Sequence, residues 1–534
     1  MPARLFARPP RGVPSADLIA TDRDLIAAVL EDAAHYPGGA AAGVAVPRSE
    51  ADVAAVLRSS RSVLPIGAQS SLTGGATPHG DVVIRTDRLT CVVHVGSDRV
   101  RVEAGVSLTD LEAALRARAF TYPPVPTFTG AFVGGIVATN AAGPATFKYG
   151  TTREWVEALT VVLADGSVLD IDRGSVRAED GELEIVTLDG KGIRVKVPSY
   201  QVPAVPKRSA GYEAAADLDA IDLFIGSEGT LGIVTEVTLR VLAPAPARCL
   251  ALVPCRSEAS ALDLVSELRD TAHRTWRDRD PHGIDVCAIE QMDRRSVSLL
   301  REDGADVRFG APIPQWTDTL LLVHLDLDPQ CTTEQAYDQI ANALEPRFDG
   351  ALVRFCRLLE YRGLMDDTQV AAPGDRARAD QLLAVREAVP AAVNRRVGIA
   401  KTAIDDRITK TAADMIVPFP AFGEMLRRYR ARLDSRGLDY AIWGHSSDGN
   451  VHPNVIPRSY EDVEAGRAAI VEWGRDVAAL GGCPLAEHGV GRNPTKQELL
   501  RQLYGHEGIE QMRAVKRALD PTWKLAPGVI FRSP

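Results

Sequence analysis

Long hydrophobic runs are missing from this chain of 534 residues. No stretch approaches the roughly 18 consecutive apolar residues that a membrane-spanning helix needs. The N-terminal segment MPARLFARPPRGVPSADL lacks the apolar core of a secretory signal. A basic excess is missing as well, because the formal net charge is −10, and proteins that bind nucleic acids normally carry a basic balance. These absences exclude a membrane-spanning chain and leave no reason to expect a nucleic-acid partner.

Paired cysteines are also missing. The seven cysteines are odd in number and scattered, and they form no C-x-x-C motif; they are Cys91, Cys249, Cys255, Cys287, Cys331, Cys356 and Cys483. This usage fits thiols in a reducing compartment better than a disulfide framework. We therefore expect a cytoplasmic protein, and attachment to the periphery of a membrane through a partner remains open.

The chain is too long for a single hydrophobic core and predicts two or three domains. The sequence PAPAR at Pro244–Arg248 is typical of a linker, so the first boundary is expected near residue 245. Before it, a helix is expected within residues 18–36, and strand, glycine-rich turn and strand within residues 222–242. After it, apolar strands alternate with helical patterns, which favours helices around an antiparallel sheet.

Local signals give sharper expectations for several elements. Helices should begin after caps at Ser49 and at Ser107 or Thr109, since serine and threonine side chains bond the first backbone N–H groups of helices. A hairpin should turn at Asp189–Gly190. A helix from residue 375 onward is expected to stop at Pro390, because proline removes a helix hydrogen bond.

Two segments rich in small residues are candidates for ligand binding. VLPIGAQSSLTGGA (63–76) matches neither G-x-x-x-x-G-K-[ST] nor G-x-G-x-x-G, so it is neither a P-loop nor a Rossmann fingerprint. Its glycines and hydroxyls suit an anion held by backbone N–H groups, although an ordinary glycine-rich turn has the same composition. AFVGGIVATNAAGPATFKYG (131–150) suits a backbone lying against a large ligand, or a close-packed backbone crossing.

Histidines gather late in the chain, in AIWGHSSDGNVHPN (441–454) and AEHGVG (486–491). The first segment supplies His445 and His452, and the second supplies Glu487 beside His488. Two imidazoles and a carboxylate form a common ligand set for a divalent metal with an open position, and a further histidine can act as a base. The alternative is that GHSSDGN is only a tight turn, because its residues are turn formers.

Taken together, IGAQSSLTGGA, PTFTGAFVGGIVATNAAGPATFKYG, FIGSEGTLGIVTEVTLRV and GHSSDGNVHPN with AEHGVGR resemble one family. It is the FAD-linked oxidase family of the vanillyl-alcohol-oxidase type, with a PCMH-type FAD-binding domain. Within it, the chain is similar to D-lactate, glycolate and D-2-hydroxyglutarate dehydrogenases. The resemblance covers residues 43–531, nearly the whole chain.

The resemblance implies an α+β fold with an FAD-binding domain of two subdomains, followed by a substrate domain with an antiparallel sheet. We expect an N-terminal arm at 1–38, the FAD-binding domain at 39–245, the substrate (cap) domain at 246–480 and a helical C-terminal segment at 481–534 that returns to the FAD-binding domain. The FAD should be bound non-covalently, because the pyrophosphate loop has Gln69 and no histidine or cysteine. The implied FAD contacts are Ile66, Gly67, Ala68, Gln69, Ser70, Ser71, Thr73, Gly74, Gly75, Thr129, Gly130, Gly134, Gly135, Ala138, Thr139, Asn140, Gly143, Glu228, Gly229, Gly232 and Ile233.

The implied reaction is oxidation of a D-2-hydroxy acid to the 2-oxo acid, with hydride transfer to the flavin N5. His445, His452 and Glu487 would hold a divalent metal, zinc or manganese, that acidifies the substrate hydroxyl, and His488 would be the base. The implied substrate-side residues are Arg386, Asn454 and Lys410, and the spacing after Lys410 departs from the family pattern. Ser447 and Ala142 also replace residues that are usually glycine.

The electron acceptor and two alternative functions stay open in the sequence. Electrons would pass to a quinone, a cytochrome or an electron-transfer flavoprotein, since no nicotinamide fingerprint is present. A flavin-dependent transferase of the alkylglycerone-phosphate synthase type shares the same FAD-binding domain but transfers no net electrons. A flavin-binding protein without catalysis is disfavoured by the intact H-x-x-D-G-N-x-H and E-H-G motifs. A homodimer is compatible with the sequence.

Overall fold

The computed structural model describes residues 3–532, which divide into two compact units. The first unit comprises residues 3–143, Gly150–Ala243 and residues 483–532. The second unit comprises Pro144–Tyr149 and Pro244–Gly482. Neither unit is therefore continuous in sequence.

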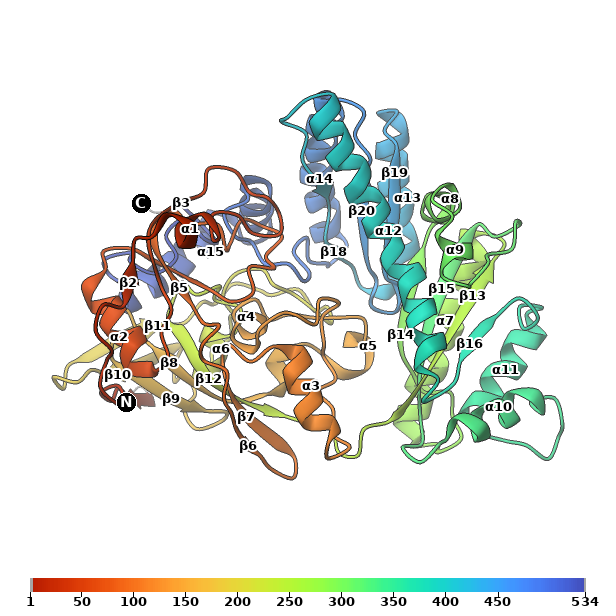
Figure 1. The fold of residues 1–534 in the computed structure, drawn as a ribbon, viewed down its shortest axis with the longest axis horizontal. Coiled ribbons are helices and arrows are strands. Elements are labelled where there is room, and N and C mark those ends of the chain that lie inside the picture. Colours follow the sequence, from red (N-terminus) through yellow and green to blue (C-terminus); the bar gives the residue numbers. More distant parts are fainter. Residues whose placement is uncertain (1–2, 533–534) are drawn as a thin grey trace. The chain divides into compact units, whose positions relative to one another are not determined.

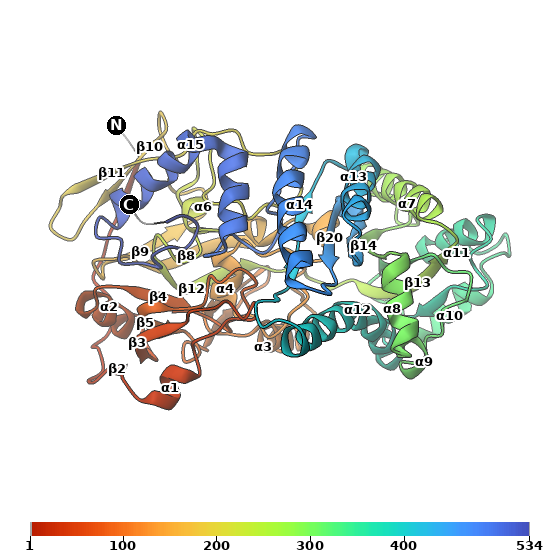
Figure 2. The same ribbon diagram turned by 90° about the horizontal axis from the view of Figure 1, so that it is seen from above.

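The first unit begins with a four-stranded sheet of order β2-β3-β5-β4. Its strands are β2 (Ile19–Ala20), β3 (Ala40–Ala45), β5 (His79–Arg85) and β4 (Val63–Ile66). Strands β3, β5 and β4 are parallel, and Figure 2 shows them side by side next to α2 (Glu50–Ser59). The residues after β4 form the first candidate ligand loop.

Two further sheets complete the strands described in this unit. The five-stranded sheet, in order, is β6 (Val92–Val95), β7 (Arg99–Glu103), β12 (Ile233–Arg240), β8 (Val156–Val162) and β9 (Val168–Asp172). A smaller sheet pairs the hairpin of β10 (Glu182–Val186) and β11 (Gly192–Lys196) with the parallel strand β1 (Ala3–Phe6). One apolar core joins the four-stranded and five-stranded sheets through Leu57, Ile84, Val162 and Ile233, and Leu525 of the C-terminal segment completes it.

Short helices connect these strands, and one long helix follows them. They are α1 (Arg23–Ala27), α3 (Leu108–Arg116), α4 (Val133–Ala138), η1 (Thr152–Trp155), α6 (Ala220–Phe224) and α15 (Pro494–Leu519). The side chain of Ser49 caps α2 and that of Ser107 caps α3, as predicted.

The second unit is built on one antiparallel sheet. Its strands, in order, are β16 (Gln369–Ala371), β13 (Ala247–Cys255), β15 (Thr319–Leu327), β14 (Val286–Met292), β19 (Tyr440–His445), β20 (Asn450–Val455) and β17 (Thr411–Ala412), and β18 (Met415–Ile416) also pairs with β20. The antiparallel sheet predicted for this half of the chain is confirmed.

Helices cover both faces of this sheet, as Figure 1 shows for α7 and α12. The alternation of side chains along β13 explains the two layers, because Cys249, Ala251 and Val253 pack in one core while Leu250 and Leu252 pack in the other. The helices are α5 (Thr146–Tyr149), α7 (Glu258–Asp278), α8 (Arg294–Glu302), α9 (Ala305–Arg308), α10 (Thr333–Ala341), α11 (Ala351–Tyr361), α12 (Arg376–Ala403), η2 (Phe419–Ala421), α13 (Phe422–Ser435), η3 (Ser446–Asp448) and α14 (Tyr460–Ala479).

Helix α5 belongs to the second unit although its neighbours in sequence belong to the first. The ring of Phe147 lies 5.0 Å from that of Trp276, centroid to centroid. The ammonium of Lys148 bonds the carboxylates of Asp285 at 2.7 Å and Asp326 at 2.9 Å. These apolar and ionic contacts fix the segment Pro144–Tyr149 against the sheet of the second unit.

The short helix expected within residues 18–36 is present as α1, and it is limited to five residues. Two other sequence predictions of secondary structure are wrong. The segment before the GSEGT turn is helix α6 rather than a strand, because Asp219 caps it by accepting the N–H of Ile221. Helix α12 continues through Pro390, where buried Val389 and Val393 on either side offset the lost hydrogen bond. Within residues 3–532, no helix is both long and apolar enough to cross a bilayer.

Candidate functional site

The first unit contains a cavity of about 310 Å³ walled mainly by small residues. It lies where the loop after β4, helix α4 and the turn between α6 and β12 come together. The predicted FAD contacts in its lining are Ile66, Gly67, Ala68, Gln69, Ser70, Ser71, Gly75, Gly134, Gly135, Ala138, Thr139, Glu228, Gly229, Gly232 and Ile233. The structure thus brings three sequence-distant segments to one cavity.

Gln69 holds the loop after β4 in shape. Its backbone adopts φ +52°, and its amide nitrogen donates to the carbonyls of Val29 at 2.9 Å and Ala76 at 3.0 Å. The hydroxyl of Ser71 accepts the N–H groups of Thr73 and Gly75, each at 3.2 Å. The loop is therefore a pre-formed turn, as its composition allows, and it also lines the cavity; binding of an anion by its N–H groups stays a prediction.

Adjacent glycines of α4 have different reasons to be glycine. A Cβ on Gly134 would lie 2.7 Å from the Cβ of Ala104, so close packing of the backbone excludes a side chain there. A Cβ on Gly135 would meet no atom within 4 Å. Since Gly135 lines the cavity, its missing side chain leaves room for a ligand.

Six predicted FAD contacts lie outside the cavity lining: Thr73, Gly74, Thr129, Gly130, Asn140 and Gly143. Three of them have a structural reason in the first unit. Gly74 has φ +75° and abuts the ring of Tyr36, and Gly143 abuts the carbonyl of Val125. The side chain of Asn140 accepts the N–H of Arg153 at 3.0 Å.

Glu228 connects the cavity to the late motif. Its two carboxylate oxygens accept the N–H of Val490 at 2.8 Å and the N–H of Gly491 at 2.9 Å. Burial raises the pKa of Glu228 to about 7, although these two hydrogen bonds act in the opposite direction. Glu228 therefore fixes the backbone that follows His488.

Glu487 and His488 both line the cavity. Glu487 forms an ion pair with Lys207, a buried lysine. The imidazole of His488 keeps 31% of its surface exposed, and its Nε2 lies 3.9 Å from the Glu487 carboxylate. A partly exposed imidazole in the wall of a cavity can exchange a proton with a bound molecule.

The two remaining histidines of the late motifs lie in the second unit, on the neighbouring strands β19 and β20. The centroids of the His445 and His452 rings are 5.7 Å apart and their planes are nearly perpendicular, at 88°. Both side chains are buried. Between the strands, η3 and Gly449 with φ +81° form the tight turn, so the turn interpretation is correct as local structure and is also what brings the two imidazoles together.

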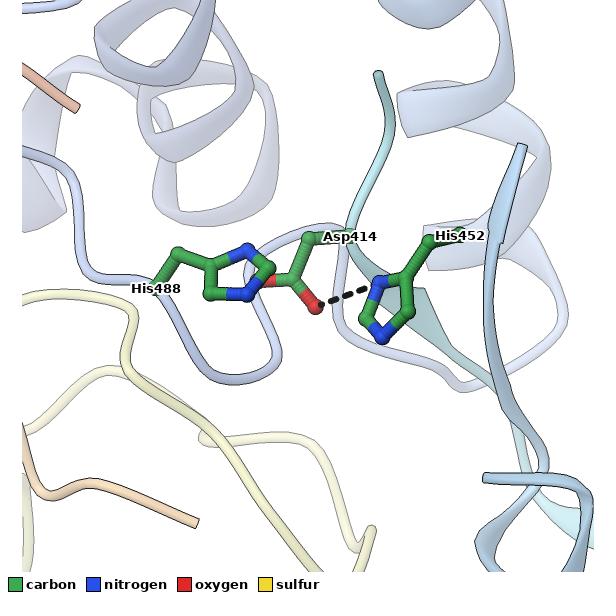
Figure 3. Close-up of side chains that lie close together, drawn as sticks. All are labelled: Asp414, His452 and His488. Carbon is green, nitrogen blue, oxygen red and sulfur yellow. Dashed lines mark ion pairs between the residues drawn. The ribbon is translucent and has the colours of Figure 1, made fainter. Parts of the chain in front are cut away.

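Each of these histidines faces a carboxylate of its own unit. Glu290 lies opposite His445 across the β14–β19 pairing, and its Oε1 is 2.7 Å from Nδ1 of His445. Asp414 lies 3.7 Å from Nδ1 of His452, and Figure 3 shows the two side chains pointing toward one another. A carboxylate at hydrogen-bond distance, as Glu290 is from His445, can orient a metal-binding imidazole.

Arg386, on α12, is buried and paired. Its Nε donates to Oε2 of Glu290 at 2.6 Å, and its Nη1 donates to Glu387 at 2.9 Å. Burial alone would raise the pKa of Glu290, but the charge of Arg386 and the hydrogen bond from His445 lower it well below its ordinary value. Glu290 is therefore an ionised carboxylate in the interior of the second unit.

The other predicted substrate-side residues differ in their burial. Asn454 is buried in β20, and its amide donates to the backbone carbonyl of His452 at 2.8 Å. Lys410 is exposed just before β17. Ser447, which replaces the usual glycine, accepts the N–H of Ile289 at 3.1 Å and so ties the turn to β14.

Sequence reasoning missed Glu290, Asp414 and Lys207. A signal for the first was present, because a lone carboxylate in the apolar run VCAIEQM must be buried and therefore needs partners. The partners themselves are far away in sequence, since Glu290 and His445 are separated by 155 positions. Nothing in the local sequence marks Lys207 as the partner of Glu487.

Comparisons with known proteins identify the family of this chain. The family model "FAD linked oxidases, C-terminal domain" matches residues 246–530, and the model "FAD binding domain" matches residues 41–172. The solved structure "alkyldihydroxyacetonephosphate synthase in P212121" has a TM-score of 0.56 at 14% identity and covers 98% of this chain and 88% of that chain. At this identity the likeness shows the fold alone.

Curated relatives extend over nearly the whole chain. D-lactate dehydrogenase of Archaeoglobus fulgidus is 27% identical over 92% of this chain and 91% of its own length. D-2-hydroxyglutarate dehydrogenase of Xanthomonas citri pv. viticola is 27% identical over 92% and 89%, respectively. Glycolate oxidase subunit GlcD of Bacillus subtilis is 26% identical over 88% and 83%. Since one family model alone spans more than half of the sequence, the chain belongs to the FAD-linked oxidases, with an α+β fold and a PCMH-type FAD-binding domain.

Proposed function

We propose that the protein is an FAD- and metal-dependent dehydrogenase that oxidises a D-2-hydroxy acid, similar to D-lactate, to the 2-oxo acid. The observation that carries the proposal is the cavity of the FAD-binding domain, which is walled mainly by small residues and whose lining includes His488. The three relatives described above support the substrate class, because their names refer to lactate, 2-hydroxyglutarate and glycolate.

The residues of the cavity fit a non-covalently bound flavin. Gly135 presents open space where any side chain would intrude, and the loop from Gly67 to Gly75 offers backbone N–H groups and serine hydroxyls. This loop contains no histidine or cysteine that could form a covalent bond to the flavin. His488, the histidine of the lining, has a different role in the proposal.

The donor set also fits a divalent metal, zinc or manganese. We propose His445, His452 and Glu487 as its ligands, the set expected from the sequence. Support comes from the second unit, where two buried imidazoles lie with their centroids 5.7 Å apart and the carboxylate of Glu290 at Nδ1 of His445 can set the protonated nitrogen of that ring. When bound, the flavin would supply the hydride acceptor and the metal an electrophile that makes the substrate hydroxyl more acidic.

The remaining roles fall to side chains of this chain. His488 would accept the hydroxyl proton, because its imidazole lines the cavity and is partly exposed. Arg386 would bind the substrate carboxylate, since a planar guanidinium suits a carboxylate better than an ammonium does. Asn454 would contact the substrate next to His452, and Lys410 would be a further substrate-side residue, although the spacing after it departs from the family pattern.

The test is a panel of D- and L-2-hydroxy acids assayed with an artificial dye acceptor on protein of measured metal content. We expect reduction of the dye with D-acids, bleaching of the flavin by D-lactate under anaerobic conditions, and loss of both after chelation. His488→Ala should abolish turnover while FAD stays bound. Unchanged turnover in this variant would show that His488 is not the base.

The same experiment separates the competing function, a transferase of the alkylglycerone-phosphate synthase type. The flavin of such an enzyme would not be left reduced by a hydroxy acid, because its reaction has no net electron transfer. We propose a quinone, a cytochrome or an electron-transfer flavoprotein as the acceptor. A cytoplasmic location agrees with the seven cysteines, all of which are free thiols.

A further inference from the structure

We infer that Glu290 is a positioning residue that couples the metal ligand His445 to the substrate-binding Arg386. The inference rests on the proposed function, because it assigns a role to a group that touches two residues of the proposed site. Neither the motifs nor their spacing point to Glu290, which lies in an otherwise apolar stretch of β14.

The geometry is that of one carboxylate shared between two partners. Oε1 of Glu290 lies 2.7 Å from Nδ1 of His445, and Oε2 lies 2.6 Å from Nε of Arg386. The exposed fractions of the side chains of Glu290 and His445 are 2% each, and that of Arg386 is 9%. Because β14 and β19 pair with Glu290 opposite His445, the sheet fixes one contact, while α12 supplies the other.

The contact with His445 determines which ring nitrogen can bind a metal. A neutral imidazole carries one N–H and one lone pair. An ionised carboxylate at Nδ1 accepts the N–H there, so the lone pair belongs to Nε2. Without Glu290 the imidazole would exchange between two tautomers and could turn about its χ2 angle. Loss of such a carboxylate typically weakens metal affinity by about 10- to 100-fold.

The contact with Arg386 connects this effect to the substrate. The guanidinium is planar, so a bond at Nε fixes the orientation of the whole group and of the donors that would meet a carboxylate. Glu290 thus sets the direction of the arginine and of the imidazole at once. Because coupling between two binding equilibria is reciprocal, the metal should strengthen substrate binding by the same factor as the substrate strengthens metal binding.

Glu387 provides a matched control on the same guanidinium. It bonds Nη1 of Arg386 at 2.9 Å, but its side chain is 51% exposed. It follows Arg386 directly on α12, whereas His445 lies on β19. Glu387→Gln therefore removes one carboxylate from Arg386 and leaves the bond between Glu290 and His445 in place.

The experiment measures metal affinity on the FAD-loaded protein without substrate. Metal-free wild type, Glu290→Gln, Glu290→Asp and Glu387→Gln are titrated with Zn²⁺ and Mn²⁺ by calorimetry, with competition by a chelator. We expect affinity to fall by about 10- to 100-fold in Glu290→Gln, by a smaller factor in Glu290→Asp, and by less than twofold in Glu387→Gln. The KM for D-lactate should rise in both Glu290 variants, and added metal should lower it less than in wild type.

The outcomes separate this inference from the proposed function. If wild type turns over D-lactate and Glu290→Gln binds the metal as tightly as wild type does, the coupling role is overturned. The enzyme assignment then still stands. An equal loss of metal affinity in Glu387→Gln also overturns the coupling role. Removing any carboxylate from Arg386 would then have the same effect, whether or not that carboxylate contacts His445. Wild type that binds no metal overturns both. If Glu290→Gln does not fold, Glu290→Asp decides, since it keeps the charge but shortens the reach.

Discussion

Replacing Gly135 by alanine should stabilise the flavin-free protein and weaken FAD binding at the same time. Gly135 lies within α4, and a Cβ there would meet no atom within 4 Å. Alanine is favoured over glycine in a helix by about 0.8–1.0 kcal/mol. The glycine is therefore costly for the empty fold, and the open cavity beside it explains why the cost is tolerated.

The expected loss of affinity follows from the size of the added group. A methyl group placed where a ligand packs against the backbone costs about 1–3 kcal/mol, as overpacking does in a protein core. This range corresponds to a dissociation constant for FAD raised by about 5- to 150-fold. Urea unfolding of the flavin-free protein gives the stability change, and quenching of FAD fluorescence during titration gives the affinity change.

Gly398 supplies the control for this experiment. It is an exposed glycine inside α12, in the second unit, and a Cβ there also meets no atom within 4 Å. Gly398→Ala should stabilise its helix by a similar amount without changing FAD affinity. If Gly135→Ala binds FAD as tightly as wild type does, the flavin does not lie against α4 and our assignment of the cavity fails.

Three further predictions concern the ionisable groups. Burial raises the pKa of Glu228 to about 7, so ionising this carboxyl should destabilise the flavin-free fold progressively from about pH 4.5 to 7, by up to about 1.4 kcal/mol per pH unit. Glu228→Gln should remove this pH dependence of the unfolding free energy in urea titrations across that range. Parallel pH profiles of wild type and variant would contradict the prediction. Lys516 is buried and bonds Asp520 and two backbone carbonyls, so Lys516→Met should lower the free energy of unfolding by about 3–5 kcal/mol. A loss below about 1 kcal/mol in denaturant unfolding would refute this. His452→Ala should abolish Zn²⁺ binding in calorimetry but keep bound FAD, because the cavity lies in the other unit; unchanged metal affinity would remove His452 from the ligand set.

Local sequence signals predicted the features that depend on neighbouring residues. The caps at Ser49 and Ser107 bond N–H groups three residues ahead, so a short window contains all the information needed. The hairpin of β10 and β11 likewise follows from its turn. In α12 the same kind of signal misled, because the tertiary packing of Val389 and Val393 outweighs the local effect of Pro390.

The candidate site was predictable in its parts but not in its partners. Glycine-rich segments and closely spaced histidines are visible as motifs, and the structure places most of the predicted flavin contacts around one cavity. The carboxylate that faces His445 and the lysine that faces Glu487 are contributed by segments 155 and 280 positions away. Such pairings depend on the fold, so a single sequence cannot reveal them.

The excursion of Pro144–Tyr149 limits how this protein can be divided for experiments. A truncation that ends near residue 243 would carry Phe147 and Lys148 without Trp276, Asp285 and Asp326, which hold them. A fragment that starts near residue 244 would lack the segment Pro144–Tyr149 and leave those two carboxylates without Lys148. Separate expression of either half should therefore give protein that folds poorly and aggregates. Fragment complementation or a circular permutant that preserves all four crossings between the units is the better route to studying them apart.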